Sequence, residues 1–187
     1  LEQYFGSETR LSVSGFFNDT QDLIGITPSN DPADTREYFS NLEQARTLGM
    51  ELEGEYRTRS GWLARASYTL QRTEDVQSGA ELSNSPQHLL KGNLVAPLWR
   101  DRVFAGIEAQ YTSRARTLPG RGIGFADPFW VVNFTLYSRE LVKGLEASAT
   151  LYNLFDSRYS YPAGSEFLPA LIEQDGRSFR AKLTYKF

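Results

Sequence analysis

The chain ends in RSFRAKLTYKF, residues 177–187, and this stretch alternates between apolar and polar side chains. Phe179, Ala181, Leu183, Tyr185 and Phe187 fall on one side, whereas Arg180, Lys182 and Lys186 fall on the other. A period of two is typical of a β-strand with one apolar face. Because the alternation runs on to an aromatic residue instead of a polar tail, we expect Phe187 to lie at the edge of an apolar environment.

The same period recurs along the whole chain, and no segment has a convincing helical period. The alternating segments cover residues 9–18, 47–57, 62–71, 89–98, 103–112, 129–138, 145–152 and the final strand. Residues 1–5 resemble the tail of a preceding strand before a Gly-Ser-Glu turn. The pattern therefore predicts an all-β, antiparallel fold of about eight strands.

The connections between these segments alternate in length. Short ones near residues 58–61, 99–102 and 139–144 alternate with long ones near 25–40, 76–87, 113–127 and 157–176. In an up-and-down sheet this places all short turns at one end and all long loops at the other. Outer-membrane barrels have this asymmetry, with short periplasmic turns and longer extracellular loops.

Composition excludes several classes of protein. The 187 residues carry a net charge of -3 and no cysteine, so neither a basic nucleic-acid footprint nor a cysteine-based metal site is present. No stretch approaches the roughly 18 apolar residues of a spanning helix. A β-strand crosses a membrane with only about 10 residues and one apolar face, so a transmembrane barrel stays open.

The choice between a soluble β-sandwich and a barrel depends on the apolar face. That face mixes aromatic residues with many Ala and Gly, instead of the large side chains that fill a sandwich core. Aromatic residues gather near strand ends, with Tyr56, Trp99 and Tyr137 towards the short turns and Tyr68 and Trp130 towards the loops. Two aromatic girdles suit lipid-facing strands, so we expect an up-and-down transmembrane β-barrel.

Three sets of residues resemble one family. Asn153, Leu154, Phe155 and Asp156 precede Tyr159, and Gly176, Arg177 and Phe179 open a last strand that ends on an aromatic residue. Upstream, TLGMELEGEYRTRSGW (47–62) and NSPQHLLKGNLVAPLW (84–99) follow in the same order. Together they resemble the C-terminal part of a TonB-dependent outer-membrane receptor.

This resemblance implies a function and a set of partners. Receptors of the family have about 22 strands around a plug, so residues 1–187 are expected to form a single barrel segment without a plug domain. The implied activity is uptake of scarce nutrients such as ferric siderophores, without an enzymatic reaction or a cofactor. A self-contained small barrel, structural or adhesive, remains the alternative.

The implied surroundings are those of the bacterial outer membrane. Lipid and lipopolysaccharide contact the barrel, and a TonB complex acts only through a part outside this chain. Tyr185 and Phe187 resemble the signal that barrel-assembly machinery reads. Both termini are expected on the periplasmic side, and no nucleic-acid partner is expected.

The polar faces of the strands carry the first candidate site. Glu51, Glu53 and Glu55 line one side of a strand, and they indicate either a cation site or, preferably, a lumen wall paired with neighbouring arginines and lysines. The expected lumen-facing residues are Glu51, Glu53, Glu55, Arg65, Glu108, Glu146, Arg180 and Lys182. Arg57, Arg65, Arg180 and Lys182 are the expected partners of the three glutamates.

The long loops carry the second candidate site. Arg114, Arg116 and Arg121 could hold an anionic ferric chelate or lipopolysaccharide phosphates, and Tyr159, Tyr161 and Phe167 are candidate aromatic contacts. The alternative is a solvated loop whose aromatic residues pack on themselves. Asp31, Asp34 and Glu37 match no known cation cage in their spacing, and no metal site is predicted.

The only histidine, His88, allows one enzymatic alternative. It lies near Ser83, Asn84 and Ser85 at the start of a strand, and some outer-membrane hydrolases use Ser, His and Asn or Asp. No nucleophile elbow accompanies it, so a polar residue at a loop-to-strand junction is the preferred interpretation.

Overall fold

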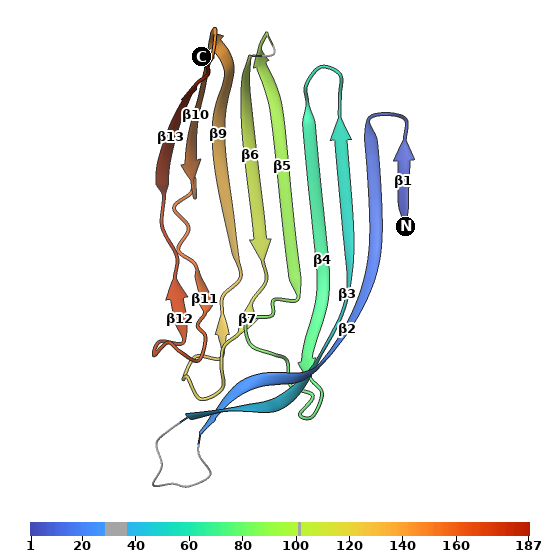
Figure 1. Ribbon diagram of the computed structural model, residues 1–187, viewed down its shortest axis with the longest axis vertical. Coiled ribbons are helices and arrows are strands. Elements are labelled where there is room, and N and C mark those ends of the chain that lie inside the picture. Colours follow the sequence, from blue (N-terminus) through green and yellow to red (C-terminus); the bar gives the residue numbers. More distant parts are fainter. Residues whose placement is uncertain (29–36, 101) are drawn as a thin grey trace.

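The computed structural model describes residues 1–28, 37–100 and 102–187, which form one nine-stranded antiparallel sheet and two small two-stranded sheets (Figure 1). The strands of the large sheet are β1 (Glu2–Phe5), β2 (Thr9–Pro28), β3 (Glu37–Arg57), β4 (Leu63–Asp75), β5 (His88–Trp99), β6 (Val103–Thr112), β9 (Phe129–Val142), β10 (Leu145–Tyr152) and β13 (Ser178–Tyr185). The small sheets pair β7 (Ala115–Arg116) with β8 (Phe125–Ala126) and β11 (Ser160–Pro162) with β12 (Leu171–Glu173).

The large sheet follows chain order, so each strand pairs with the next strand of that sheet. All eight predicted strands are present, and residues 2–5 form the additional strand β1. The sheet is open, with β1 and β13 as its two edges. The described strands therefore do not close into a small barrel.

The ends of the sheet differ as the connection lengths predict. Figure 1 shows the short turns at the upper end and the long loops, with β7, β11 and β12, at the lower end. Phe187 lies at the short-turn end, whereas Leu1 lies beside Val13 and exchanges backbone hydrogen bonds of 2.7 and 2.8 Å with it.

The expected loop over residues 25–40 is wrong in its extent. β2 continues to Pro28 and β3 begins at Glu37, with Ile26 paired to Phe39 across the hairpin. Aromatic and β-branched residues favour strands, and here they carry the hairpin past the rest of the sheet (Figure 1). The candidate residues Asp31 and Asp34 lie outside the described residues, and the side chain of Glu37 does too.

One face of the large sheet is mainly apolar from β2 to β13. Val13 pairs with Leu52, which pairs with Tyr68, and Ile107 pairs with both Leu94 and Phe134. Directly paired residues point to the same side of a sheet, so these side chains form one continuous surface. It is exposed, as the 61% exposure of Leu48 and the 74% exposure of Leu183 show. Among the described residues, no helix is long and apolar enough to cross a membrane.

The prediction that Tyr137 belongs to the aromatic girdle of the apolar face is wrong. It pairs with Phe104 on the polar face, and the two rings stack with centroids 6.3 Å apart. The register of β9 places Leu136 and Ser138, not Tyr137, on the apolar side. Towards the loops, the rings of Tyr111 and Trp130 contact each other with centroids 4.9 Å apart.

Among the described residues, the buried apolar side chains lie at the loop end. They are Ala115, Ala126, Phe129, Ala163 and Ala170. Small side chains let the β7–β8 and β11–β12 hairpins approach closely, and β11 contacts both β7 and β8. Loops that the sequence predicts as irregular therefore fold into a packed layer over one end of the sheet.

Candidate functional site: the polar face and the loop end

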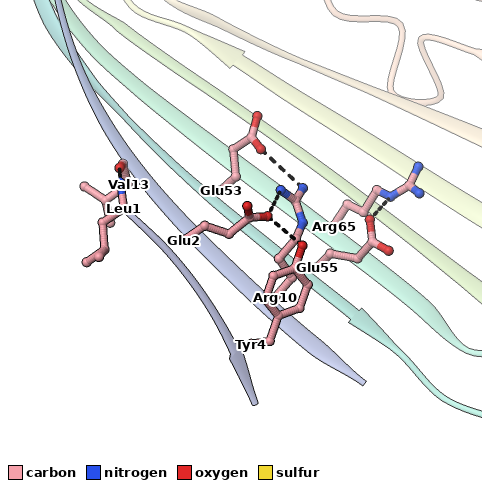
Figure 2. Close-up of polar contacts among 8 residues, drawn as sticks. All are labelled: Leu1, Glu2, Tyr4, Arg10, Val13, Glu53, Glu55 and Arg65. Carbon is pink, nitrogen blue, oxygen red and sulfur yellow. Dashed lines mark hydrogen bonds and ion pairs between the residues drawn. The ribbon is translucent and has the colours of Figure 1, made fainter. Parts of the chain in front are cut away.

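Arg10 joins three strands on the polar face (Figure 2). Its guanidinium donates to Glu2 Oε1 on β1 at 3.1 Å and to Glu53 Oε2 on β3 at 3.4 Å. The hydroxyl of Tyr4 donates to the same Glu2 oxygen at 2.9 Å. Arg10 was not among the residues predicted for this site, although the alternation with Leu11 and Val13 places Arg10 on the polar side.

Glu55 forms the third ion pair drawn in Figure 2. Arg65 Nε lies 2.8 Å from Glu55 Oε2, and Arg57 Nη2 lies 3.5 Å from Oε1 of the same carboxylate. Arg65 and Arg57 are thus two of the four expected partners of the glutamates. Arg180 and Lys182 are not, because β13 pairs only with β10 in this sheet.

A hollow of about 380 Å³ lies over this network. Charged and polar side chains of the five neighbouring strands β2 to β6 line it, including Arg10, Glu53, Arg65, Lys91 and Glu108. Three cations and three carboxylates in one concavity are suited to polar contacts with water or with another polar segment. Within the described residues, no group of three or more His, Asp or Glu side chains is arranged to hold a metal ion.

The other predicted lumen residues share this face but make separate contacts. Glu108 accepts a hydrogen bond from Asn133 Nδ2 at 3.2 Å, and Glu146 lies 2.6 Å from Lys186 Nζ. The guanidinium of Arg180 lies over the Tyr152 ring at 5.5 Å. Glu51 points to this side because it pairs with Ser14 and Thr69. Lys182 does so because it pairs with Ser148.

Asn153 builds the elbow that leads from β10 into the last loop. It is 3% exposed and has φ of 48°, a left-handed conformation that Asn tolerates. Its Nδ2 donates to the carbonyls of Ser157 at 2.9 Å and Asp175 at 3.3 Å, and its Oδ1 accepts from Ser157 N at 2.9 Å. The side chain therefore joins the two ends of the loop.

Asp156 fixes the entry to the final strand. Its Oδ1 accepts the backbone N–H of Arg177 at 2.8 Å, and a Cβ on Gly176 would lie only 2.9 Å from that oxygen. The glycine therefore gives the carboxylate room to reach Arg177. The sequence motifs at 153–156 and 176–177 belong to one hydrogen-bonded corner.

Three aromatic rings pack together at the loop end of the polar face. The centroid of Phe129 lies 4.5 Å from that of Tyr159 and 5.3 Å from that of Tyr161. Burial raises the pKa of the Tyr159 phenol. These rings border a hollow of about 350 Å³ that Arg180 also reaches from β13.

The three loop arginines make three different contacts. Arg121 donates to the backbone carbonyls of Phe167, of Leu168 at 2.8 Å and of Ser165 at 3.0 Å. Arg114 lies over the Phe125 ring at 4.8 Å, and Arg116 is exposed on β7. Arg121 thus joins two loops, and no contact brings the three guanidiniums together among the described residues.

His88 lies on the apolar face at the loop end, paired with Leu70. Its Nδ1 is 2.8 Å from the Tyr68 hydroxyl, and the two rings stack with centroids 6.1 Å apart. Its backbone N–H donates to Ser113 Oγ at 3.0 Å. The ring is therefore engaged by a tyrosine, and no hydrogen bond joins it to Ser83 or Ser85 in the described structure.

The comparisons with known proteins agree with this geometry. The profile of the family described as TonB dependent receptor-like, beta-barrel matches residues 1–154. The chain therefore belongs to the TonB-dependent receptor β-barrel family.

Particular relatives can now be named. The chain is 26% identical over 193 residues to "Heme/hemopexin utilization protein C" of Haemophilus influenzae (strain 86-028NP). The alignment covers 97% of this chain and 26% of the relative. A second relative of the same name, from Haemophilus influenzae strain ATCC 51907, is 24% identical over 202 residues. That alignment covers 97% of this chain and 27% of the relative. The chain thus spans about a quarter of the curated relatives it matches.

Solved structures show the same fold. The ferric yersiniabactin uptake receptor FyuA from Yersinia pestis has a TM-score of 0.76 at 18% identity, covering 98% of this chain and 28% of that one. The ferripyoverdine receptor of the Pseudomonas aeruginosa outer membrane has a TM-score of 0.73 at 21% identity, covering 99% of this chain and 26% of that one.

Proposed function

We propose that this chain forms part of the barrel wall of an outer-membrane receptor that takes up an iron-containing nutrient. The observation that carries the proposal is the apolar face that continues from β2 to β13 in the large sheet. It is opposed by a charged face with its own ion pairs. This division suits a wall between lipid and a polar lumen.

The height of the apolar face supports a membrane location. On β3 it extends from Tyr56 to Leu48, and Arg46 follows as the first charged residue on that side, ion-paired with Asp19 at 3.4 Å. The ten residue steps from Arg46 to Tyr56 rise about 33 Å along the strand. A tilt of about 40° reduces this to about 25 Å, which matches the apolar band of outer-membrane barrels.

The open sheet defines how the wall is completed. β1 and β13 each present an unpaired edge, and unpaired backbone groups are costly in lipid. Further strands of a longer receptor would pair with both edges. The fact that the chain spans about a quarter of its relatives supports this arrangement over a self-contained small barrel.

The cargo is an iron compound bound at the loop end. The relatives are named for heme and hemopexin utilization, and the structural neighbours include receptors for ferric yersiniabactin and ferripyoverdine. The hollow beside Tyr159, Tyr161 and Arg180 offers ring surfaces and one cation to such a ligand. Arg114 and Arg116 on the neighbouring loop and Phe167 on the loop of Tyr159 are candidate further contacts, and Arg121 joins the two loops.

Orientation and partners follow from the same arrangement. The long loops face the cell exterior, and the short turns, with Phe187, face the periplasm. Tyr185 and Phe187, whose rings meet edge to face at 5.2 Å, form the aromatic end that the barrel-assembly machinery recognises. Lipopolysaccharide contacts the outer rim, and coupling to a TonB complex uses parts of the receptor beyond these residues.

The chain acts as a transporter wall and not as an enzyme. The hydrolase alternative needs His88 to activate a serine, and its ring is instead held by Tyr68 on the apolar face. A His88→Ala receptor is expected to transport normally. Loss of an ester-hydrolysing activity in that variant would favour the hydrolase.

Transport is tested in an iron-starved strain that lacks the receptor gene. The full-length receptor is expected to restore growth on heme or on a ferric siderophore as the sole iron source, and to lose this ability when the proton gradient is removed. A receptor that restores growth on neither would contradict the proposed cargo. Growth on only one of them would identify it.

Orientation is tested with single introduced cysteines, which are informative because residues 1–187 contain no cysteine of their own. Leu168→Cys, at a loop position that is 94% exposed, is expected to react with an impermeant maleimide in intact cells. Lys143→Cys, in a short turn, is expected to react only after the outer membrane is opened. The opposite pattern would reverse the proposed orientation.

A further inference from the structure

The turn between β5 and β6 carries an irregular segment at the short-turn end of the apolar face (Figure 1). β5 pairs regularly with β6 as far as Pro97 and Phe104. Leu98 is then left out of the register, and Trp99 pairs with Val103. Leu98 continues the alternation of the apolar side, and Trp99 joins that side because its partner Val103 belongs to it. Two consecutive apolar side chains, 57% and 50% exposed, therefore face the same way.

Arg100 adds a cation to this pair. Its φ of 46° is a left-handed conformation, which costs a non-glycine residue about 1 kcal/mol. The backbone N–H of Arg102 donates to the carbonyl of Trp99 at 2.8 Å and closes the turn. The guanidinium of Arg100 lies over the Trp99 ring, 5.4 Å from its centroid. A cation–π contact at an exposed site contributes about 0.5–1 kcal/mol, so it offsets most of the backbone cost and fixes the cation beside the apolar pair.

The cluster combines two kinds of surface. Stacking engages the π face of the guanidinium and leaves its in-plane N–H groups available, and these suit the oxygens of a phosphate. The indole ring and Leu98 suit the glycerol and the upper acyl chain of a lipid, because Trp favours the boundary between lipid and water. Both surfaces are matched by a phospholipid, whereas a free phosphate would leave the apolar pair uncovered.

Charge selects among phospholipids. Arg100 and Arg102 flank Asp101, which lies outside the described residues, so the segment 100–102 has a net charge of +1 by sequence. A headgroup with a net negative charge, as in phosphatidylglycerol, matches this charge. The ammonium group of phosphatidylethanolamine cancels the charge of its phosphate and loses the match. A basic residue close to an anionic membrane surface contributes about 1 kcal/mol to the attraction.

We propose that Leu98, Trp99 and Arg100 bind one anionic diacyl phospholipid of the periplasmic leaflet. This inference rests on the proposed function, in which the apolar face meets lipid and the short turns face the periplasm. Arg59, in the β3–β4 turn, is not part of the site, because it lines a hollow of the polar face. Arg59 therefore provides a matched control at the same end of the sheet.

The test uses the full-length receptor in vesicles that contain equal amounts of phosphatidylglycerol and phosphatidylethanolamine with identical acyl chains. The photo-reactive residue benzoylphenylalanine replaces Leu98, and a matched variant carries it at Phe134 in the middle of the apolar face. Mass spectrometry identifies the lipids that irradiation couples to each position. Position 98 is expected to capture phosphatidylglycerol about fivefold over phosphatidylethanolamine, which corresponds to about 1 kcal/mol. Position 134, away from the turn, is expected to capture both lipids equally.

A charge variant assigns the preference to Arg100. Adding Arg100→Gln is expected to lower the preference at position 98 to less than about twofold, whereas Arg59→Gln leaves it unchanged. Salt at about 0.5 M is expected to weaken the preference without any change in the turn, because it screens the headgroup charge. The variants must migrate as folded barrels in SDS without heating. Equal capture of the two lipids at position 98, or a preference that survives both Arg100→Gln and high salt, would overturn the proposal.

The outcomes separate this inference from the proposed function. Lipid adducts at both positions without any headgroup preference would refute only the anionic site and leave the lipid-facing wall intact. Absence of lipid adducts at position 134 would refute the wall itself. In intact outer membranes, capture of lipopolysaccharide at position 98 would place the short turns at the exterior and contradict the proposed orientation.

Discussion

Replacing Asn153 with alanine tests the elbow that joins the two ends of the last loop. The substitution removes the two hydrogen bonds from Nδ2 to Ser157 and Asp175 and the one that Oδ1 accepts from Ser157. At about 1 kcal/mol each, their loss costs about 3 kcal/mol. Alanine at φ of 48° adds about 1 kcal/mol, so the expected local destabilisation is about 4 kcal/mol.

Hydrogen exchange of the full-length receptor in detergent micelles measures this effect. The amide of Ser157 loses its acceptor, and a cost of about 4 kcal/mol corresponds to about a thousandfold faster exchange if the loop opens as a unit. Asn153→Gly separates the two contributions, because glycine accepts the left-handed conformation and loses only the hydrogen bonds. Protection of Ser157 that changes less than tenfold in Asn153→Ala would refute the role assigned to the elbow.

Three further predictions concern the two faces and the loops. Leu52→Arg, in the middle of the apolar face, is expected to destabilise the receptor in bilayers by about 2–4 kcal/mol in urea unfolding, whereas Ser67→Arg, opposite Glu53 on the polar face, changes it by less than 1 kcal/mol. Because the pKa of Tyr159 is raised in the folded loop, its contribution to loop stability is complete below the unfolded value of about 10 and falls as pH rises through the folded value. Proteolysis of the loop should therefore accelerate above that pH in wild type and not in Tyr159→Phe. Gly176→Ala places a Cβ 2.9 Å from Asp156 Oδ1 and is expected to free the Arg177 amide, seen as faster exchange at that residue, while Gly124→Ala, which meets no atom within 4 Å, leaves exchange unchanged.

The sequence predicts the sheet well because period two is a local property of each strand. The apolar partners Val13, Leu52 and Tyr68 meet in register although they are far apart in the chain, since a shift by one residue would turn every side chain to the wrong face. Residues 25–28 and 37–40 were predicted as loop because Pro, Gly and Asp cluster around them. Their pairing follows from the hairpin as a whole, as with Ile26 and Phe39.

The candidate site was less accessible to sequence reasoning. The alternation assigned Glu53, Glu55 and Arg65 to one face, and four cations were expected as partners of the glutamates. Arg57 and Arg65 do pair with Glu55, but the cation beside Glu53 is Arg10 on β2, which was not among the expected partners. Which residues meet depends on register between strands, and the sequence carries no direct record of register. The loop contacts of Arg121 have the same origin, because its acceptors are backbone carbonyls of a second loop that any residues would provide.

The two ends of the polar face differ in how tightly their side chains are packed. At the loop end, Phe129, Tyr159 and Tyr161 cover one another and Arg121 joins the neighbouring loops, so the protein supplies its own packing there. At the short-turn end, Phe104 stacks on Tyr137 and lies beneath Arg139, and a hollow of about 680 Å³ lies beside them. Loops that are already ordered lose less conformational entropy when they bind a ligand, so the packed loop end suits the ligand-binding role proposed for it.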